Sequence, residues 1–426
     1  MEASNVSRKR TEHVPSVLQQ HAEEASFLWL LRSAAVAEPH YSLQDLSVLD
    51  TRVEAHIDAL RIAGGAGIAT CLEALANEEA GEAFAAALLA FERGDAEAVE
   101  QVVRVIERSP AAFAGAASAL GWLQLPDALA WISRMTEARS PTYRRLGIAA
   151  YSIHREDPGP ALVRLVEDGE VFVRVRALRA VGELKRRDLL PVLRAALRSE
   201  DDAVRFWAAW SATLLGEQAG AEHLRTFVHS GKPFAYRAIQ LVPRVLRLDD
   251  AIGWVKQLAT NAATRRVAVI GSGVVGDPSF IPGLIGLMSV PEYARVAGAA
   301  FSMITGVDLA FEDLEGDRPA GFEAGPTEDP DDENVEMDPD ENLPWPAQGL
   351  VRRWWETNSE RFRPGRRYLC GRALDAENCR RVLREGRQRQ RIAAAYELAL
   401  MNAAEPLFEW RAPAFRQEQW LGRAGA

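Results

Sequence analysis

The chain has 426 residues, a hydrophobic fraction of 48% and a formal net charge of -10 at pH 7. This length exceeds one ordinary compact core, so we expect several domains or an elongated repeat protein. The net negative charge argues against recruitment to nucleic acid by bulk electrostatics. No apolar run of signal length follows the charged residues 1–10, and no window reaches the roughly eighteen apolar residues of a membrane span, which predicts a cytoplasmic protein without membrane contact.

The three cysteines favour reduced thiols. Cys71, Cys370 and Cys379 are odd in number and lack a CxxC spacing, so they indicate neither a disulfide framework nor a zinc site. We predict no metal and no cofactor.

Two helices are predicted at the start of the chain, over residues 14–36 and 43–62. The break at 37–42 separates them, and Gly64 and Gly65 end the second. An atypical terminal helix pair is typical of the end of a repeat array, where it covers the first exposed face. We therefore predict an N-terminal helical cap over 1–65.

A repeat of about 30 residues follows. Six arginines, called the anchor arginines below, recur at spacings of 28 to 32 residues: Arg145, Arg174, Arg205, Arg237, Arg265 and Arg295. Eleven residues after each stands a predicted turn position: Glu156, Lys185, Gly216, Leu248, Gly276 and Gly306. Small and apolar residues at helical spacing lie between anchor and turn, and an apolar run follows the turn. Each unit is therefore predicted to be helix, turn, helix, with glycine supplying the left-handed cap.

Two repeat units with a weaker pattern precede Arg145 at the same spacing. One contains Ala83 and a turn at Gly94 and Asp95, and another contains Ala114 and a turn at 125–127. About eight units then cover residues 66–309. Because one unit cannot bury its apolar face alone, the units must stack, which predicts an all-α fold, an α/α solenoid of helical hairpins.

The repeat pattern resembles HEAT repeats, especially the short repeats of the phycobilin-lyase type. The resemblance rests on Asp202-Ala203-Val204-Arg205 at a helix start, and on Val173-Arg174 ahead of Ala177 and Gly182. It implies fold far more than function. Two interpretations of the anchor arginines stay open: pairing with acidic residues of neighbouring units, which we favour, or a basic stripe on the concave face.

An acidic segment follows the repeats. Fourteen acidic residues stand between positions 312 and 341 against the single Arg318, and four prolines exclude a long helix. A disordered loop is predicted over 310–348. A calcium loop at Asp329, Asp331 and Glu333 is disfavoured, because Asn334 stands where the sharp-turn glycine belongs.

The C-terminal segment, 349–426, is predicted to be helical and rich in arginine and tryptophan. Between positions 351 and 391, thirteen arginines face five acidic residues. Either the acidic loop folds back over these arginines, or they form a docking site for a separate acidic partner. The tryptophans of this region favour core packing over partner anchors; they are Trp345, Trp354, Trp355, Trp410 and Trp420.

Three stretches extend the resemblance over nearly the whole chain. Residues 20–29, 39–41 and 386–391 together resemble an uncharacterised family of proteobacterial HEAT-repeat proteins. That resemblance implies an association with type VI secretion gene clusters. It further implies a chaperone or adaptor that holds an effector or spike component.

Motifs of known chemistry give no catalytic residue. Residues 271–276 spell GxGxxG but fall within a predicted repeat helix with no strand before it, which argues against dinucleotide binding. None of the seven histidines precedes a glutamate, as the iron hydroxylases among HEAT-like proteins require. No serine or cysteine has an activation signature, so we predict a protein that is not an enzyme, with a lyase-type enzyme as a weak alternative.

The sequence thus predicts a scaffold that binds another protein. The alternative is a nucleic-acid-binding protein similar to the HEAT-like DNA glycosylases, which cradle DNA on a basic surface with tryptophans. The candidate partner-binding residues are Arg174, Arg205, Trp207, Trp210, Arg237, Trp354, Trp355, Arg387, Arg389 and Arg391.

Overall fold

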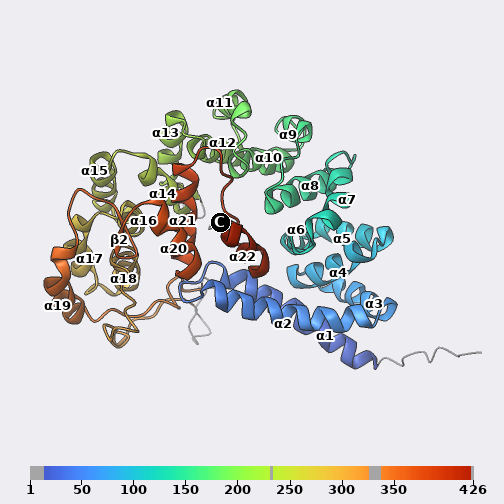
Figure 1. Cartoon of the computed structure of the whole chain (residues 1–426), viewed down its shortest axis with the longest axis horizontal. Coiled ribbons are helices and arrows are strands. Elements are labelled where there is room, and N and C mark those ends of the chain that lie inside the picture. Colours follow the sequence, from blue (N-terminus) through green and yellow to red (C-terminus); the bar gives the residue numbers. More distant parts are fainter. Residues whose placement is uncertain (1–13, 231–233, 326–336, 424–426) are drawn as a thin grey trace, which may run out of the picture. The chain divides into compact units, whose positions relative to one another are not determined.

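The computed structural model describes residues 14–230, 234–325 and 337–423. These residues form an all-α solenoid of paired helices with one short β-hairpin, as predicted (Figure 1). The chain divides into two units. Unit 1 contains Met1–Ala34, Asp45–His154 and Ala412–Ala414, and unit 2 contains Ala35–Gln44, Arg155–Arg411 and Phe415–Ala426. The predicted domain ranges stay predictions, and the disfavoured calcium loop lies outside the described residues.

No helix in the described part of the chain is long and apolar enough to cross a membrane.

Unit 1 begins with the two predicted helices and continues with helix pairs. Its helices are α1 (Pro15–Ala35), α2 (Leu43–Ile62), α3 (Gly65–Ala74), the 3-10 turn η1 (Leu75–Asn77), α4 (Ala80–Arg93), α5 (Ala96–Arg108), α6 (Ala112–Trp122), α7 (Leu125–Thr136) and α8 (Pro141–His154). Gly94 has the predicted left-handed conformation, with φ of 68°. The predicted turn at 125–127 is wrong. These residues begin α7, because proline in the first helical turn lacks only an N–H that would be unpaired anyway.

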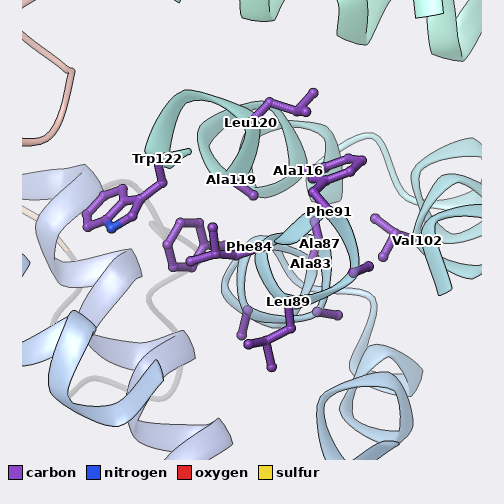
Figure 2. Close-up of a cluster of buried hydrophobic side chains, with 14 of the residues drawn as sticks. Ala83, Phe84, Ala87, Leu89, Phe91, Val102, Ala116, Ala119, Leu120 and Trp122 are labelled. Carbon is purple, nitrogen blue, oxygen red and sulfur yellow. The ribbon is translucent and has the colours of Figure 1, made fainter. Parts of the chain in front are cut away.

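The core of unit 1 lies where α4 packs on α6 (Figure 2). Phe84 of α4 stacks on Trp29 of α1 at a centroid distance of 5.3 Å and meets the edge of Trp122 of α6 at 5.2 Å. Alanines on both helices, among them Ala83 and Ala116, are fully buried. The small alanine side chains let the backbones of α4 and α6 approach closely. The aromatic rings of Phe84, Trp29 and Trp122 fill the space beside this contact.

A buried ion pair fixes the short C-terminal piece of unit 1. Arg32 Nε lies 2.7 Å from Asp50 Oδ1, and Arg32 Nη2 donates to the carbonyl of Ala412 at 2.6 Å. The backbone N–H of Ala414 donates to Asp50 Oδ2 at 2.6 Å. Both charged side chains are almost completely buried, so each depends on the other and on these backbone groups.

Unit 2 continues the repeat. Its repeat helices are α9 (Pro160–Leu165), α10 (Val171–Glu183), α11 (Leu190–Ala196), α12 (Asp202–Leu214), α13 (Gln218–Phe227), α14 (Phe234–Val245), α15 (Leu248–Ala259), α16 (Ala262–Val275), α17 (Ile281–Leu287) and α18 (Pro291–Thr305), with 3-10 turns η2 (Arg187–Leu189) and η3 (Pro278–Phe280). We call α10, α12, α14, α16 and α18 the first helices. Successive first helices pack on one another, and all five anchor arginines of this unit lie on them. The turn predicted at Leu248 is wrong, because this residue begins α15, with Asp249 and Asp250 favourable in its first turn.

The C-terminal segment is helical around a hairpin. It contains α19 (Gln348–Asn358), η4 (Ser359–Arg361), β1 (Tyr368–Leu369), β2 (Arg372–Ala373), α20 (Ala376–Glu385), α21 (Gln388–Met401) and α22 (Ala414–Arg423). Tyr368 pairs with Ala373 in the antiparallel hairpin. Helix α20 packs on α21, and α21 contacts α14 (Figure 1).

Two glycines show why the first helices need small residues. A Cβ at Gly182 of α10 would lie 2.7 Å from the Cα of Ser211 in α12. Gly276 ends α16 with φ of +74°, and a Cβ there would lie 2.4 Å from the carbonyl oxygen of Tyr368. Within the GxGxxG spelling, a Cβ at Gly273 would lie 3.1 Å from the Cα of Ala300 in α18, so the motif serves helix packing and a helix end, as predicted.

Replacing Gly182 tests this close approach. We expect Gly182→Ala to lower the free energy of unfolding by about 1–3 kcal/mol, because the methyl group meets the backbone of α12. Gly253→Ala in α15 is the matched control, since nothing lies within 4 Å of its added Cβ. We expect this control to raise stability by up to about 1 kcal/mol through helix propensity. Urea unfolding of both variants checks the pair, and equal effects would contradict the close packing.

Candidate partner-binding surface

Three first helices of unit 2 contribute to one cation and aromatic stack. Trp207 of α12 lies between two guanidinium groups: the Cζ of Arg179 of α10 is 4.8 Å from its ring centroid, and that of Arg237 of α14 is 5.5 Å away. We call these three residues the Arg–Trp stack. Cations over the face of tryptophan are attracted by the ring quadrupole. The stack therefore links three consecutive repeats at the level of their side chains.

Exposure within the stack is uneven. Trp207 is 9% exposed, and its neighbour Trp210 is 2% exposed, with its ring edge toward Trp207 at 5.3 Å. Arg237 is exposed and the side chain of Arg179 is 35% exposed. A partner that reaches this surface would thus meet the two guanidinium groups first, with the tryptophan holding them in place.

A buried glutamate orients one side of the stack. Glu183 accepts hydrogen bonds from Arg176 Nη1 at 3.0 Å and from Arg179 Nε at 2.7 Å. Burial raises the pKa of Glu183, but the charges of Arg176, Arg179 and Arg155 outweigh this effect and lower the pKa to about 2. The carboxylate is therefore ionised at neutral pH and fixes Arg179 beside Trp207.

The anchor arginines Arg174 and Arg205 have a different role. Nη1 of Arg174 donates to the carbonyls of Asp168 and Gly169, at 2.6 and 3.0 Å. Nη1 of Arg205 donates in the same way to Ser199 and Glu200. Both sets of carbonyls belong to the loop before the arginine's own helix. Arg205 also pairs with Asp202, but this acid belongs to its own helix. The favoured prediction of acidic partners in neighbouring units is therefore wrong at these positions, because the loop carbonyls of the arginine's own unit need donors.

Arginines of two other helices also donate to carbonyls that precede their own helix. In one of them the donor is the residue before the predicted anchor. In α16, Arg265 Nε donates to the carbonyl of Ala259 at 3.3 Å. In α8 of unit 1, Arg144 donates to the carbonyls of Ala138 and Arg139. The predicted anchor there was Arg145, whose guanidinium instead lies 3.7 Å from the ring centroid of Phe113.

Arginines at the start of α21 contact their own chain. Arg387 Nη1 donates to the carbonyl of His40 at 3.0 Å, and Arg389 Nε donates to that of Ala37 at 3.1 Å. The N–H of Gln388 donates to the carbonyl of Tyr41 at 2.8 Å. The helix start and the break at 37–41 thus meet in space, which joins two of the three stretches that carry the wider family resemblance.

Arg391 is fully buried. Its Nε donates to the carbonyl of Leu383 at 2.7 Å, and its Nη2 donates to Gln417 Oε1 at 2.6 Å. This guanidinium holds α20, α21 and α22 of the C-terminal segment together. Arg391 does not present its charge to a partner in this arrangement.

The two tryptophans of α19 lie in a third place. Trp354 Nε1 donates to Glu312 at 3.0 Å, and its ring edge meets Phe301 at 5.6 Å. Trp355 lies 5.5 Å from Phe362. Both are half-buried. Of the predicted partner-binding residues, the structure therefore brings Trp207, Trp210 and Arg237 into contact, and Arg205 lies on the same helix as the two tryptophans but bonds to its own loop.

Donors of the C-terminal segment meet the ends of the first helices, which sequence reasoning missed. Arg367 donates to the carbonyls of Pro243 and Leu246 at the end of α14, and to that of Val275 at the end of α16. The N–H of Tyr368 donates to the carbonyl of Gly276 at 2.8 Å. No sequence signal exists for such contacts, because the acceptors are backbone atoms.

The acidic segment also contacts first helices. Asp340 lies 2.6 Å from Arg266 of α16, and Asp338 lies 2.6 Å from the anchor Arg295 of α18. Its pairing with the arginine-rich C-terminal segment stays a prediction. The predicted disorder stays a prediction too, and residues 326–336 lie outside the described part.

Comparison with known families bears on this surface. Residues 159–242 match the family model of HEAT repeats. The matched residues include all three members of the Arg–Trp stack. Together with the paired helices, the match supports a HEAT-repeat protein. The search of curated proteins returned no match.

Glu183 provides a test that depends on pH. We expect Glu183→Gln to cost about 3 kcal/mol at pH 7, because the largely buried Arg176 loses its anion, while the partly exposed Arg179 can still be hydrated. In the unmodified protein, the carboxylate contributes stability above its ordinary pKa of 4.5, and this contribution is lost as the pH falls toward about 2. The variant should therefore lose less stability across that range.

Urea unfolding at a series of pH values measures both effects. The matched control is Glu217→Gln, which removes an ion pair with the exposed Arg194 and should change stability little. Parallel pH profiles for Glu183→Gln and the unmodified protein would contradict the low pKa of Glu183.

Proposed function

We propose that this chain is a protein-binding scaffold without enzymatic activity, and that its partner docks on the Arg–Trp stack of unit 2. HEAT repeats commonly mediate protein interactions. The observation that carries the proposal is the stack itself, in which α10, α12 and α14 each place one residue. Tryptophan and arginine are the residues most enriched at the energetic centres of protein interfaces.

The charge of this surface favours an acidic partner segment. Glu183 already neutralises part of the charge of Arg176 and Arg179. Arg237 adds an exposed guanidinium, and no ion pair joins it to a carboxylate among the residues that the structure describes. A carboxylate of the partner could accept two parallel hydrogen bonds from such a group. Complementary charge would also raise the rate of association.

Two side chains with shifted pKa values, Glu183 and Lys185, make contacts that support a structural role and not a catalytic one. Glu183 holds two arginines, and Lys185 donates from Nζ to the carbonyls of Leu214 and Ala399 at 2.7 and 2.6 Å. Burial and the nearby charge of Arg187 lower the pKa of Lys185 to about 8. Both shifts thus arise at contacts that hold helices together, and structural networks of this kind perturb pKa values without chemistry.

The finer proposal is an adaptor or chaperone in a bacterial cytoplasm that holds a type VI secretion effector or spike component. It rests on the wider family resemblance of residues 20–29, 39–41 and 386–391. The contacts of Arg387 and Arg389 with the carbonyls of His40 and Ala37 support a shared structural role for the last two stretches.

Nucleic-acid binding remains the second candidate, because arginine over tryptophan also suits stacked bases. Asp338 and Asp340 of the acidic segment pair with Arg295 of α18 and Arg266 of α16 in the same unit, and these carboxylates would repel phosphates there. Protein binding is therefore favoured.

Charge reversal at Arg237 tests the proposal. We expect Arg237→Glu to reduce the recovery of a stoichiometric protein partner at least about tenfold, since a central contact is worth more than about 1.4 kcal/mol. Quantitative mass spectrometry after affinity purification from native cells gives the measurement. The matched control Arg198→Glu changes an exposed arginine beyond the end of α11 and should leave recovery unchanged. Recovery of nucleic acid alone, or equal losses in both variants, would overturn the proposal.

A further inference from the structure

Unit 2 contains a cavity of about 310 Å³, partly open to solvent, whose wall includes the Arg266–Asp340 ion pair and Arg389 described above. Its walls come from α14, α16, α18, α21 and the end of the acidic segment. The apolar part of the wall consists of Ile270, Val274, Val296, Met303 and Ile392. A volume of this size lies at the lower end of the range of small-molecule sites, roughly 300–1,000 Å³, and such sites are mostly apolar with a few fixed polar groups.

The polar part of the wall is cationic. Arg244, Arg266 and Arg389 all line the cavity, with Asp340 as the lining carboxylate. Asp340 pairs with Arg266 at 2.6 Å, and the nearby Glu397 lies 3.4 Å from Arg244. Arg389 donates to a neutral acceptor, the carbonyl of Ala37. Arg266 and Arg244 therefore each have a carboxylate partner, whereas Arg389 makes no ion pair among the described residues, and the charges of Asp340 and Glu38 act on it only from beyond ion-pair distance. This leaves room for one more negative charge beside Arg389.

One polar group of this wall lacks an acceptor. The side chain of Arg244 is only 2% exposed, and its Nε has no hydrogen-bond partner among the described residues. Its ion pair with Glu397 is made through Nη1 and is long for a hydrogen bond. This Nε is closed off from solvent, so Arg244 acts on the cavity mainly through its charge, and the partly exposed Arg389 is the guanidinium that a ligand can reach.

We propose that this cavity binds a small amphipathic monocarboxylate. The carboxylate accepts from the guanidinium of Arg389, with the buried charge of Arg244 adding to the attraction, and the alkyl body lies against Ile270, Val274 and Met303. A planar carboxylate matches the guanidinium geometry. A medium-chain fatty acid of the size of decanoate combines the single charge and the apolar bulk that the wall requires.

Other ligand chemistries fit this wall less well. A dianion such as phosphate would bring a second negative charge toward Asp340 and Glu397 while leaving the apolar wall uncovered. A peptide would place backbone N–H and C=O groups against Val274 and Met303, where they find no partners. A cationic amphiphile would meet three guanidinium groups.

Calorimetric titration of the full chain with decanoate tests this inference. We expect saturable binding of one decanoate, with decylamine and decanol, which share its chain length, at least about tenfold weaker. Equal binding of all three would show adsorption to apolar surface and would overturn the proposal, as would the absence of saturable decanoate binding.

Two variants locate the site by independent means. Ala299→Leu fills the cavity from α18 without changing its charge, and Arg389→Gln removes one cation from its wall. We expect each to weaken decanoate binding at least about tenfold, with a folded circular dichroism spectrum. Arg194→Gln, at an exposed arginine of α11, is the matched control and should bind normally. Unchanged binding in a folded Ala299→Leu variant would overturn the assignment. Arg237 does not line the cavity. The decanoate measurement therefore does not depend on whether Arg237→Glu changes partner recovery.

Discussion

The unpaired carbonyl groups of helix ends and loops are the constraint on which the rest of this structure depends. Each repeat contains two short helices, and each helix leaves carbonyls that its own hydrogen bonds cannot satisfy. Buried backbone acceptors must find donors, or stability is lost. Arg174 and Arg205 supply donors to the loops before their helices, and Arg367 supplies them to the ends of α14 and α16. Arginine side chains therefore cap the helix ends and also hold neighbouring repeats together.

This constraint explains the composition of the chain. Nearly all of its 50 basic residues are arginine, whose fork of five N–H donors can reach two carbonyls at once, whereas lysine offers a single point of charge. Arg367 contacts three carbonyls from two helices. An arginine-rich C-terminal segment is consequently a structural part of unit 2, and its local positive charge is a poor guide to a partner.

The periodic part of the fold could be predicted from the sequence, whereas the acceptors could not. Recurrence every 28 to 32 residues placed the anchor arginines on the first helices, because a repeated pattern reports repeated burial. A backbone oxygen has no side-chain identity, so nothing in the sequence distinguishes a carbonyl acceptor from an acidic one. The shift from Arg145 to Arg144 has a similar cause. Adjacent helical residues point about 100° apart, and only the packed structure shows which one faces the loop.

The candidate surface was predictable in part for the same reason. Trp207 and Arg237 were among the predicted residues, whereas Arg179 was missed although it precedes Trp207 by nearly one repeat. Its signal was masked because Arg174, Arg176 and Arg179 share one helix, and periodicity alone does not rank them. The buried Glu183, which selects Arg176 and Arg179 as its partners, became visible only with the side chains in place.

Charge is distributed unevenly along the first helices of unit 2, and this distribution limits where an acidic partner can bind. Asp338 and Asp340 of the chain itself neutralise Arg295 of α18 and Arg266 of α16. Arg295 is further covered by Trp345, whose ring centroid lies 4.5 Å from its Cζ. On α14, by contrast, Arg237 keeps an exposed guanidinium. The acidic segment therefore occupies one end of the row of repeats, and an incoming acidic surface gains most at the other, beside Trp207.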